Sequence, residues 1–393
     1  MEYKNARDIL PTELVKVLQN YVQGTYLYIP KRVEDYIKSH HRTDYKVELE
    51  KRNYHIYLKH LEGWSDEKLA IFYNLSRSSI RRIVLYHKRK VENMTKEIES
   101  VLSVWGLEGK RIVQRYHSVW EIGNGYMLKV YSDKNQLDRN IKMLTILHDF
   151  NIPVAEIICT RSGEKYTVSE KHYYMLTGKL KGNNISDIRN FGLAYSMGDA
   201  IGQLHIAFQK CEDKLSVEDN SLLVEMNGWV REVLFKDNWQ IIKEDEYINT
   251  VNGLQSVYEK LPKQLIHRGV HFGNFLFYEN EFSGYIDFDL SQRNIRIFDI
   301  CYFLAGLLTE ESGADLKCGE WLRILKEVVS GYENRTSLST IEKQAFPCVM
   351  KSIEILCVAY FITIEDVRCA NDAANVFRYI QMHENEIRRK ISD

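Results

Sequence analysis

Apolar residues recur at helical spacing near the start of the chain and predict helices over Ile9–Val22 and about Tyr45–His60. Residues 62–64 (Glu-Gly-Trp) end the second helix. Ser65 follows at once, and its hydroxyl can accept a hydrogen bond from the free backbone N–H groups of a new helix. The first part of the chain is therefore expected to be all helical.

Residues 65–84, SDEKLAIFYNLSRSSIRRIV, have the spacing of a helix-turn-helix. Ala70 is small where two helices would cross, and Asn74 lies at the turn, where asparagine tolerates a left-handed backbone. Leu69, Leu75, Ile80 and Ile83 would form the shared core, and Ser76 can cap the second helix. The second helix would present Ser76, Arg77, Ser78, Ser79, Arg81 and Arg82, which can contact phosphates and base edges of double-stranded DNA. A plain helical hairpin with a solvated basic face is the alternative.

The pattern changes to strands after residue 107. Strands are predicted at Arg111–Gln114, Val119–Ile122 and Tyr126–Tyr131, with a hairpin turn at Asn124-Gly125 that places both turn residues at positive φ. A helix over about Asn135–Phe150 follows, and then two further strands within 151–158 and 172–180. These elements predict a small antiparallel sheet with one helix. Helices follow after Gly182, the first over Ser196–Gln209, and helices again dominate after Gly306.

Composition places few further limits on the protein. Its 393 residues, 45% apolar and 27% charged, suit two or three globular domains. The seven cysteines are scattered, with no two at metal-ligand or redox spacing, which favours reduced thiols. The longest apolar runs, Ile297–Leu308 and Ile353–Ile364, each contain an acidic residue and are too short to span a bilayer. We therefore expect buried core helices, no membrane partner and a cytoplasmic location.

Charge is distributed unevenly along the chain. The formal net charge is −1, yet residues 1–94 carry 18 basic and 12 acidic side chains. Such asymmetry suggests an anionic partner for the basic part, and a solvated charged surface is the alternative.

Candidate catalytic chemistry lies in LIHRGVHFGNFLFYENEFSGYIDFDLSQRNIRIFDICYFLAG, residues 265–306. Short apolar strands are predicted at Gln264–Ile266 and Phe275–Phe277, and a third over Ser283–Phe288. Asn274 and Asp287 would thus lie at the ends of neighbouring strands, where their oxygens can bind Mg²⁺. With Lys129 in a strand to pair with phosphates, this is the arrangement of a kinase.

The same segment resembles the aminoglycoside phosphotransferase and choline kinase family over about residues 100–393. His267, Asn274, Asp287 and the later Asp299 match the family motif in register, and Lys129 matches its phosphate-pairing lysine. The resemblance implies ATP and Mg²⁺ as cofactors and a small-molecule hydroxyl as acceptor. It also implies that Asp299 braces the catalytic loop. Acidic residues of the C-terminal helices bind cationic acceptors in this family, and the candidates here are Glu310, Glu311, Asp315, Glu354 and Asp366.

Two departures from the family motif affect the expected activity. The catalytic aspartate, which orients and deprotonates the acceptor hydroxyl, is replaced by Gly269. The glutamate that pairs with the lysine is also missing, and Asn140 or Asp138 lies nearest its place. His271 could act as a poor base or simply hold the loop. His267 is expected to hold the loop backbone, and Arg268 faces either substrate or Asp299.

The N-terminal segment resembles the small Mor-type transcription activators over nearly all of residues 1–90, in DILPTELVKVLQNYVQGTYLYIPKR and GWSDEKLAIFYNLSRSSIRRIV. This resemblance implies a helical DNA-binding domain, which would contact double-stranded DNA through residues 65–90.

The expected architecture is α+β. A helix-turn-helix domain (1–94) precedes a bilobal kinase-like domain (100–393), with a small sheet lobe over about 105–180 and a mainly helical lobe over about 181–393. The leading hypothesis is an ATP-dependent phosphotransferase impaired by Gly269. The alternative is a catalytically inactive nucleotide sensor that regulates DNA binding by the first domain.

Overall fold

The computed structural model describes Val15 and residues 52–73, 75–184, 188–215, 219–309 and 316–392. The chain divides into two compact units, Met1–Glu50 and Lys51–Asp393, and the elements below belong to the second. Apart from Val15, which is helical, the predicted helix Ile9–Val22 lies outside the described residues, as do Asn74, Glu310, Glu311 and Asp315.

Two helices joined by a short turn follow the helical residues 52–61. The first is α5 (Asp66–Phe72) and the second α6 (Arg77–Val101). Both predicted caps are confirmed, because the Ser65 and Ser76 hydroxyls accept hydrogen bonds from the backbone N–H groups of Lys68 and Ser79. The predicted core is also confirmed, with Leu69 and Ile80 fully buried and Leu75 and Ile83 packed against them.

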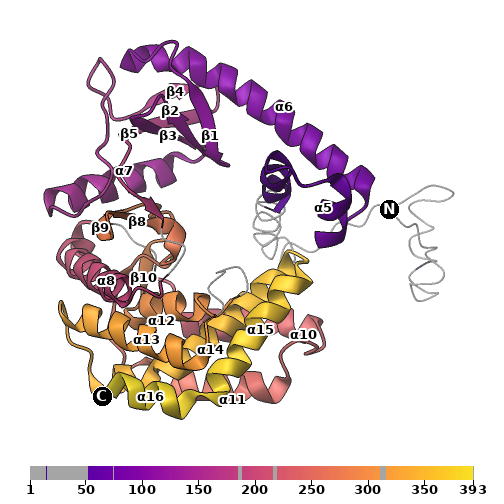
Figure 1. Cartoon of the computed structure of the whole chain (residues 1–393), viewed down its shortest axis with the longest axis vertical. Coiled ribbons are helices and arrows are strands. Elements are labelled where there is room, and N and C mark those ends of the chain that lie inside the picture. Colours follow the sequence, from indigo (N-terminus) through magenta and orange to yellow (C-terminus); the bar gives the residue numbers. More distant parts are fainter. Residues whose placement is uncertain are drawn as a thin grey trace. The chain divides into compact units, whose positions relative to one another are not determined.

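Helix α6 is continuous over 25 residues and belongs to two hydrophobic clusters. Its first half packs with Leu69 and Tyr54 in the hairpin, and its last turns bring Ile98 and Val101 onto the sheet that follows. Val91 contacts both clusters. The second helix of the hairpin therefore continues as one element to the sheet (Figure 1).

The sheet has five antiparallel strands in the order β1-β2-β3-β5-β4. Successive residues of a strand point to opposite faces, so Tyr174 and Leu176 pack beneath α6 while Met175 packs with α7 (Lys134–Asp149) on the other side. The predicted sheet with one helix is confirmed in this form. The strands are β1 (Ile112–Tyr116), β2 (Val119–Ile122), β3 (Tyr126–Tyr131), β4 (Thr167–Ser169) and β5 (His172–Gly178).

Some local predictions in this lobe are wrong. The β2–β3 hairpin forms, but its left-handed residue is Gly123 at φ 59°, and neither Asn124 nor Gly125 has positive φ. Residues 151–158 make only isolated bridges, of Val154 to Tyr285 and of Ile157 to Thr177. Pro153 lacks the N–H that a ladder requires, which is consistent with this interruption.

The rest of the chain is mainly helical, as expected. Helices α8 and α13 cross closely because each offers a glycine: a Cβ on Gly198 would lie 1.9 Å from the Val328 carbonyl, and one on Gly331 would lie 2.0 Å from that of Tyr195. The helices are α8 (Phe191–Cys211), α9 (Leu222–Glu225), α10 (Arg231–Lys236), α11 (Glu244–Tyr258), α12 (Ile297–Gly306), α13 (Cys318–Glu333), α14 (Thr340–Thr363), α15 (Val367–Met382) and α16 (Glu384–Ser392).

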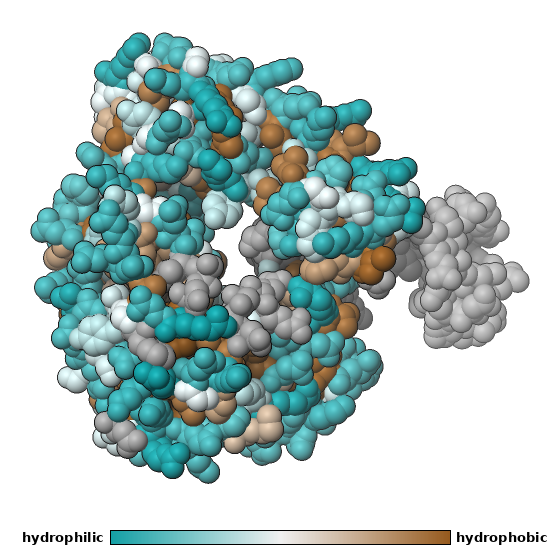
Figure 2. Space-filling view, in the orientation of Figure 1, coloured by the Kyte–Doolittle hydropathy of each residue, from teal (hydrophilic) through white to brown (hydrophobic). Residues whose placement is uncertain are grey.

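Helix α14 is the one helix in the described part of the chain with the length and apolarity to cross a membrane. Most of its apolar window is buried, with Phe346, Val349 and Ile353 fully enclosed by neighbouring helices. It is a core helix in this structure, as predicted for Ile353–Ile364. The face of the molecule in Figure 2 is mostly hydrophilic, with apolar residues dispersed among polar ones.

Two small sheets hold the loop of candidate catalytic residues. Strand β7 (Lys263–Ile266) pairs with β10 (Gln292–Ile295), and β8 (Phe275–Tyr278) lies between β6 (Asn183–Asn184) and β9 (Glu281–Tyr285). The strand predicted over Ser283–Phe288 ends early at Tyr285. Asp287 has a left-handed backbone with φ 61°, which cannot continue a strand and turns its carboxylate toward the sheet lobe.

Candidate active site

Asp299 organises the loop after β7 from the first turn of α12. Its fully buried carboxylate accepts hydrogen bonds from the backbone N–H groups of His267 and Arg268, each at 2.8 Å. The His205 ring contributes a third contact, with Nε2 3.0 Å from Oδ2. Three contacts to one buried carboxylate fix the loop where it leaves the strand.

The ring of His267 joins this loop to the segment that carries Asp287. Nδ1 accepts the Gly269 N–H at 3.2 Å, so the ring proton lies on Nε2, which donates to the Ile286 carbonyl at 3.1 Å. Burial lowers the pKa of His267, which keeps the ring neutral. Both ring nitrogens are engaged with backbone, as expected for a residue that holds the loop.

Gly269 is buried beside Asn274. The Asn274 amide nitrogen donates to the Gly269 carbonyl at 3.0 Å, and none of the residues that the structure describes donates to its amide oxygen. The backbone of Gly269 does not have positive φ. A Cβ there would lie 3.2 Å from the Asn274 amide nitrogen, a contact that a small side-chain shift relieves. The fold therefore does not require glycine at this position.

The Arg268 side chain pairs with Glu225 and not with Asp299, one of the two partners predicted for it. The guanidinium donates to both oxygens of Glu225, at 2.7 and 2.8 Å, and lies over the Phe298 ring. Only its backbone N–H reaches Asp299. Arg268 also has a left-handed backbone at φ 62°, so the loop reverses direction at this residue.

Lys129 projects from β3 toward the two carboxylates of the Asp287-Phe288-Asp289 segment. Its Nζ lies 3.1 Å from Asp287 Oδ1 and 2.7 Å from Asp289 Oδ2. Burial lowers the pKa of Lys129, but Tyr131 and the two carboxylates outweigh burial and raise it overall. Burial likewise raises the pKa of Asp287, but Lys129 lowers it below the usual range. Lys129 and Asp287 are therefore both charged at neutral pH.

The prediction that Asn140 or Asp138 on the following helix pairs with Lys129 is wrong. Asp138 pairs with Lys134 at 2.6 Å, and Asn140 donates to Asp289 Oδ1. Asp289 thus bridges Lys129 and Asn140.

His271 lies in the same loop, ahead of a turn of 3-10 helix (Phe272–Asn274). Its Nδ1 accepts the Gly273 N–H at 3.0 Å, and the other ring nitrogen, Nε2, takes no part in this bond. The ring keeps contact with solvent, yet crowding removes part of its hydration and lowers its pKa, and His267 lowers it further. His271 is therefore mostly neutral at pH 7.

Two further polar residues support the loop, and neither was predicted. Asn184 donates to the carbonyls of Phe272 and Gly273 at 2.9 and 2.8 Å, and Glu225 holds Arg268. Both lie far from the loop in sequence. No local spacing could have indicated them.

The acidic candidates for the acceptor side have different environments. Asp366 caps α15 by accepting the Cys369 N–H at 3.0 Å. Glu354 on α14 is 3% exposed, and burial, together with Asp372, raises its pKa to about 8. At neutral pH this carboxyl is mostly protonated.

Searches of solved structures find a shared fold at low sequence identity. One is an amicoumacin kinase, hAmiN, in complex with AMP-PNP, Ca²⁺ and Ami, at 15% identity and TM-score 0.56, covering 76% of this chain and 96% of that one. An aminoglycoside phosphotransferase from Alicyclobacillus acidocaldarius has 14% identity and TM-score 0.56, covering 75% and 96%. The microcompartment-associated aminopropanol kinase has 13% identity and TM-score 0.55, covering 75% and 98%. The predicted kinase-like fold is thus confirmed.

A curated relative also matches part of this chain. The uncharacterized protein YraL of Bacillus subtilis (strain 168) is 33% identical over 84 residues, which are 97% of that protein and 21% of this chain.

The model of the phosphotransferase enzyme family matches residues 106–320, a span that holds Lys129, the loop at 267–274 and Asp287. This chain therefore belongs to the phosphotransferase enzyme family.

Proposed function

We propose that this protein transfers the γ-phosphoryl group of ATP to a hydroxyl of a small molecule, at a rate reduced by Gly269. The observation that carries the proposal is the convergence of Lys129 with Asp287, at 3.1 Å, from separate lobes of a kinase-like fold. Phosphoryl transfer depends on positioning and on stabilising charge, and a lysine opposite a carboxylate supplies both.

Lys129 would pair with the phosphates of the nucleotide. Its ammonium now pairs with both Asp287 and Asp289. An incoming triphosphate offers a stronger anionic partner and would bring a divalent cation for the carboxylates. The site can thus exchange its internal ion pairs for external ones.

Asn274 and Asp287 fit the needs of Mg²⁺, which takes one or two protein oxygens and completes its shell with phosphates and water. The Asn274 nitrogen is fixed on the Gly269 carbonyl, so its oxygen faces away from the loop backbone. Asp287 is half exposed and ionised. When bound, Mg²⁺ would neutralise phosphate charge.

The acceptor hydroxyl must lose its proton as its oxygen bonds to the γ-phosphorus and the bond to the ADP oxygen breaks. An aspartate at 269 would take that proton, but glycine cannot. The transferred phosphoryl oxygens can accept it instead, and losing a positioned base typically slows transfer by about 10²- to 10⁴-fold.

Calorimetric titration with ATP, with and without Mg²⁺, tests the nucleotide site. The proposal expects Mg²⁺-dependent binding that is lost when Asp287 is changed to Asn. A panel of hydroxyl acceptors is then assayed for ADP release with the Gly269→Asp protein. No nucleotide binding at millimolar ATP would overturn the proposal.

A second function is suggested by the exposed basic face of α6. Arg77, Arg81 and Arg82 are solvent-exposed on the helix that also packs against the sheet lobe. This supports the alternative in which the hairpin binds double-stranded DNA and a catalytically inactive nucleotide site regulates it. Measuring duplex binding with and without ATP distinguishes the phosphotransferase from the nucleotide-regulated DNA-binding protein. An affinity for DNA that changes with ATP, together with a Gly269→Asp protein that transfers no phosphate, favours the DNA-binding protein.

A further inference from the structure

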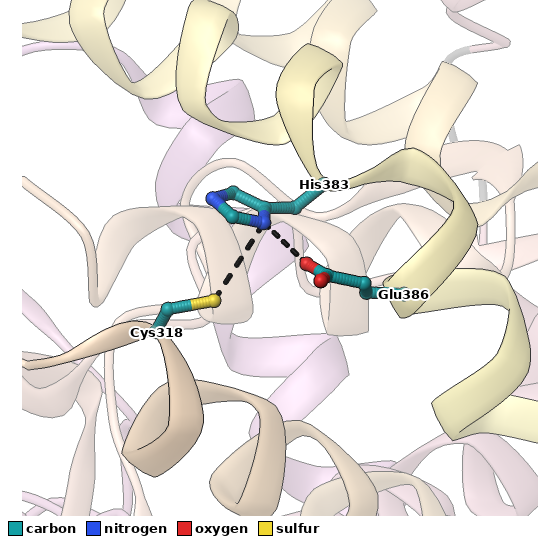
Figure 3. Close-up of side chains that lie close together, drawn as sticks. All are labelled: Cys318, His383 and Glu386. Atoms are coloured by element: carbon teal, nitrogen blue, oxygen red, sulfur yellow. Dashed lines mark hydrogen bonds and ion pairs between the residues drawn. The ribbon is translucent and has the colours of Figure 1, made fainter.

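Three side chains with metal-ligand chemistry meet where α13, α15 and α16 come together. Cys318 is the first residue of α13, His383 ends α15, and Glu386 lies in the first turn of α16. One ligand atom from each lies within 4.8 Å of the other two (Figure 3). These residues are separate from the transfer site, and all three are partly exposed.

The contacts converge on a single ring nitrogen. His383 Nδ1 lies 3.7 Å from the Cys318 sulfur and in close contact with Glu386 Oε2. A neutral ring offers Nδ1 either as a donor to the carboxylate or as an acceptor from the thiol, but not both. A cation between the three atoms would satisfy all of them at once.

A nucleophilic Cys-His-Glu arrangement needs different geometry. In such a site one ring nitrogen faces the thiol and the other faces the carboxylate, so that a proton passes through the ring. Here both contacts are on Nδ1, as Figure 3 shows. The cluster therefore has the arrangement of a ligand set.

Tyr379 lies beside the same cluster. Its ring is tilted against that of His383 with centroids 4.5 Å apart, and its buried hydroxyl adjoins the Cys318 thiol. A water bound at the cluster would give this hydroxyl a hydrogen-bond partner of normal geometry.

We propose that Cys318, His383 and Glu386 bind Zn²⁺, with water as the fourth ligand. Thiolate, imidazole and carboxylate together select Zn²⁺ over the hard Mg²⁺. In a tetrahedral site the sulfur and nitrogen are about 3.5 Å apart, from bond lengths near 2.3 and 2.05 Å. The present 3.7 Å is close to this value. Glu386 must withdraw by about an ångström, which its 44% exposure permits.

The ion would act as a cross-link, because its ligands come from the ends of three helices. Two of them, α15 and α16, meet at His383, and the third, α13, packs against α8 in the core of the helical lobe. Partial exposure gives the ion a path of entry. Zinc should therefore raise the thermal unfolding midpoint of the protein.

Cobalt titration of the chelator-treated full-length protein tests the site, because Co²⁺ bound by thiolate gives a sulfur-to-metal charge-transfer band. We expect one equivalent of Co²⁺ to produce this band and Zn²⁺ to remove it. The band should be lost in Cys318→Ser and retained in the matched control Cys159→Ser, which alters an exposed thiol. Circular dichroism verifies folding of each variant.

Two results would overturn the zinc site. One is a band that persists in Cys318→Ser, which would assign the ion to another thiol. The other is saturation of the wild-type protein with Co²⁺ without the band, which would leave the cluster an ordinary ion pair between His383 and Glu386. As a second readout, Zn²⁺ should raise the unfolding midpoint of the wild-type protein and leave that of Cys318→Ser unchanged.

Discussion

The side-chain amide of Asn274 donates a 3.0 Å hydrogen bond to the backbone carbonyl of Gly269. The bond uses only a main-chain atom of residue 269, so a side chain at that position would not remove its acceptor. The loop thus keeps its shape although the carboxylate is missing. Position 269 can therefore be changed without rebuilding the site around it.

Gly269→Asp should fold normally and raise phosphoryl transfer. The backbone at 269 suits any residue, and only the Asn274 amide nitrogen, 3.2 Å from the new Cβ, must shift slightly. Restoring the base should increase the rate by about 10²- to 10⁴-fold with a competent acceptor. Steady-state ADP release measures this.

Gly269→Asn is the matched control, since it adds similar volume without a base and should remain slow. Equal rates for the aspartate and asparagine variants would contradict a missing base as the cause of low activity.

Asp299→Asn should destabilise the protein and loosen the catalytic loop. The amide replaces an oxygen that accepts hydrogen bonds with an NH₂ group, which leaves one loop N–H or His205 without its partner. Loss of charged hydrogen bonds in a fully buried site should cost about 2–4 kcal/mol, measured by urea unfolding. Asp138→Asn, at an exposed ion pair on α7, should cost less than about 1 kcal/mol. Similar losses in both variants would contradict the role of Asp299.

Magnesium alone should bind weakly, because Asp287 and Asp289 are already paired with Lys129. ATP would attract Lys129 to its phosphates and free the carboxylates, so the nucleotide and the metal should each strengthen binding of the other. Calorimetry with either partner first should give the same coupling free energy, as linkage requires. Tight binding of Mg²⁺ without nucleotide would contradict the exchange of partners.

Glu354→Gln should change how stability depends on pH. In the unfolded chain this carboxyl ionises near pH 4.5, whereas burial raises its folded pKa to about 8. The folded state binds more protons between these values, so this group's stabilisation is complete below pH 4.5 and is lost as pH rises toward 8.

The neutral glutamine lacks this effect, so Glu354→Gln should gain stability over wild type across that range, on the order of a few kcal/mol. Urea unfolding at pH 5 and pH 8 measures it, with Glu281→Gln at an exposed site as control. A difference from wild type that does not vary with pH would contradict the raised pKa.

Arg82→Ala should weaken duplex DNA binding and reduce its salt dependence by about one counterion. Arg81 pairs with Asp66 at 2.8 Å and Arg77 with Glu67 at 2.7 Å, so both are partly neutralised in the free protein. Asp66→Asn should release Arg81 and tighten binding. Fluorescence anisotropy at several salt concentrations measures both effects. An Arg82→Ala protein that behaves like the distant control Arg389→Ala would contradict the DNA-binding face.

Sequence patterns predicted the structure correctly where the interactions that determine it are local. Strands β2 and β3 matched their predicted bounds because alternation of side chains is a property of the strand itself. Ser65 and Ser76 were identified as caps because a cap acts within one turn. The hairpin turn was wrong because Gly123 competes with Asn124-Gly125 for the left-handed position, and register with β3 decides between them.

Long-range contacts could not be predicted from spacing. Asp289 replaces the expected helix residue as partner of Lys129, although 160 positions separate them in sequence and only the fold joins them. Cys318 and His383 were likewise unrelated in the sequence, where no cysteine had metal-ligand spacing. Tertiary folding brought both pairs together.

The continuity of α6 has a consequence for rotation about the helix axis. An α-helix turns by about 100° per residue, so the number of residues between the hairpin cluster and Ile98 sets the direction in which the Arg82 face points. Inserting one residue after Val91 would rotate that face by about 100°, whereas inserting seven would return it to within about 20°. The length of α6 therefore sets the direction of the Arg82 face relative to the sheet.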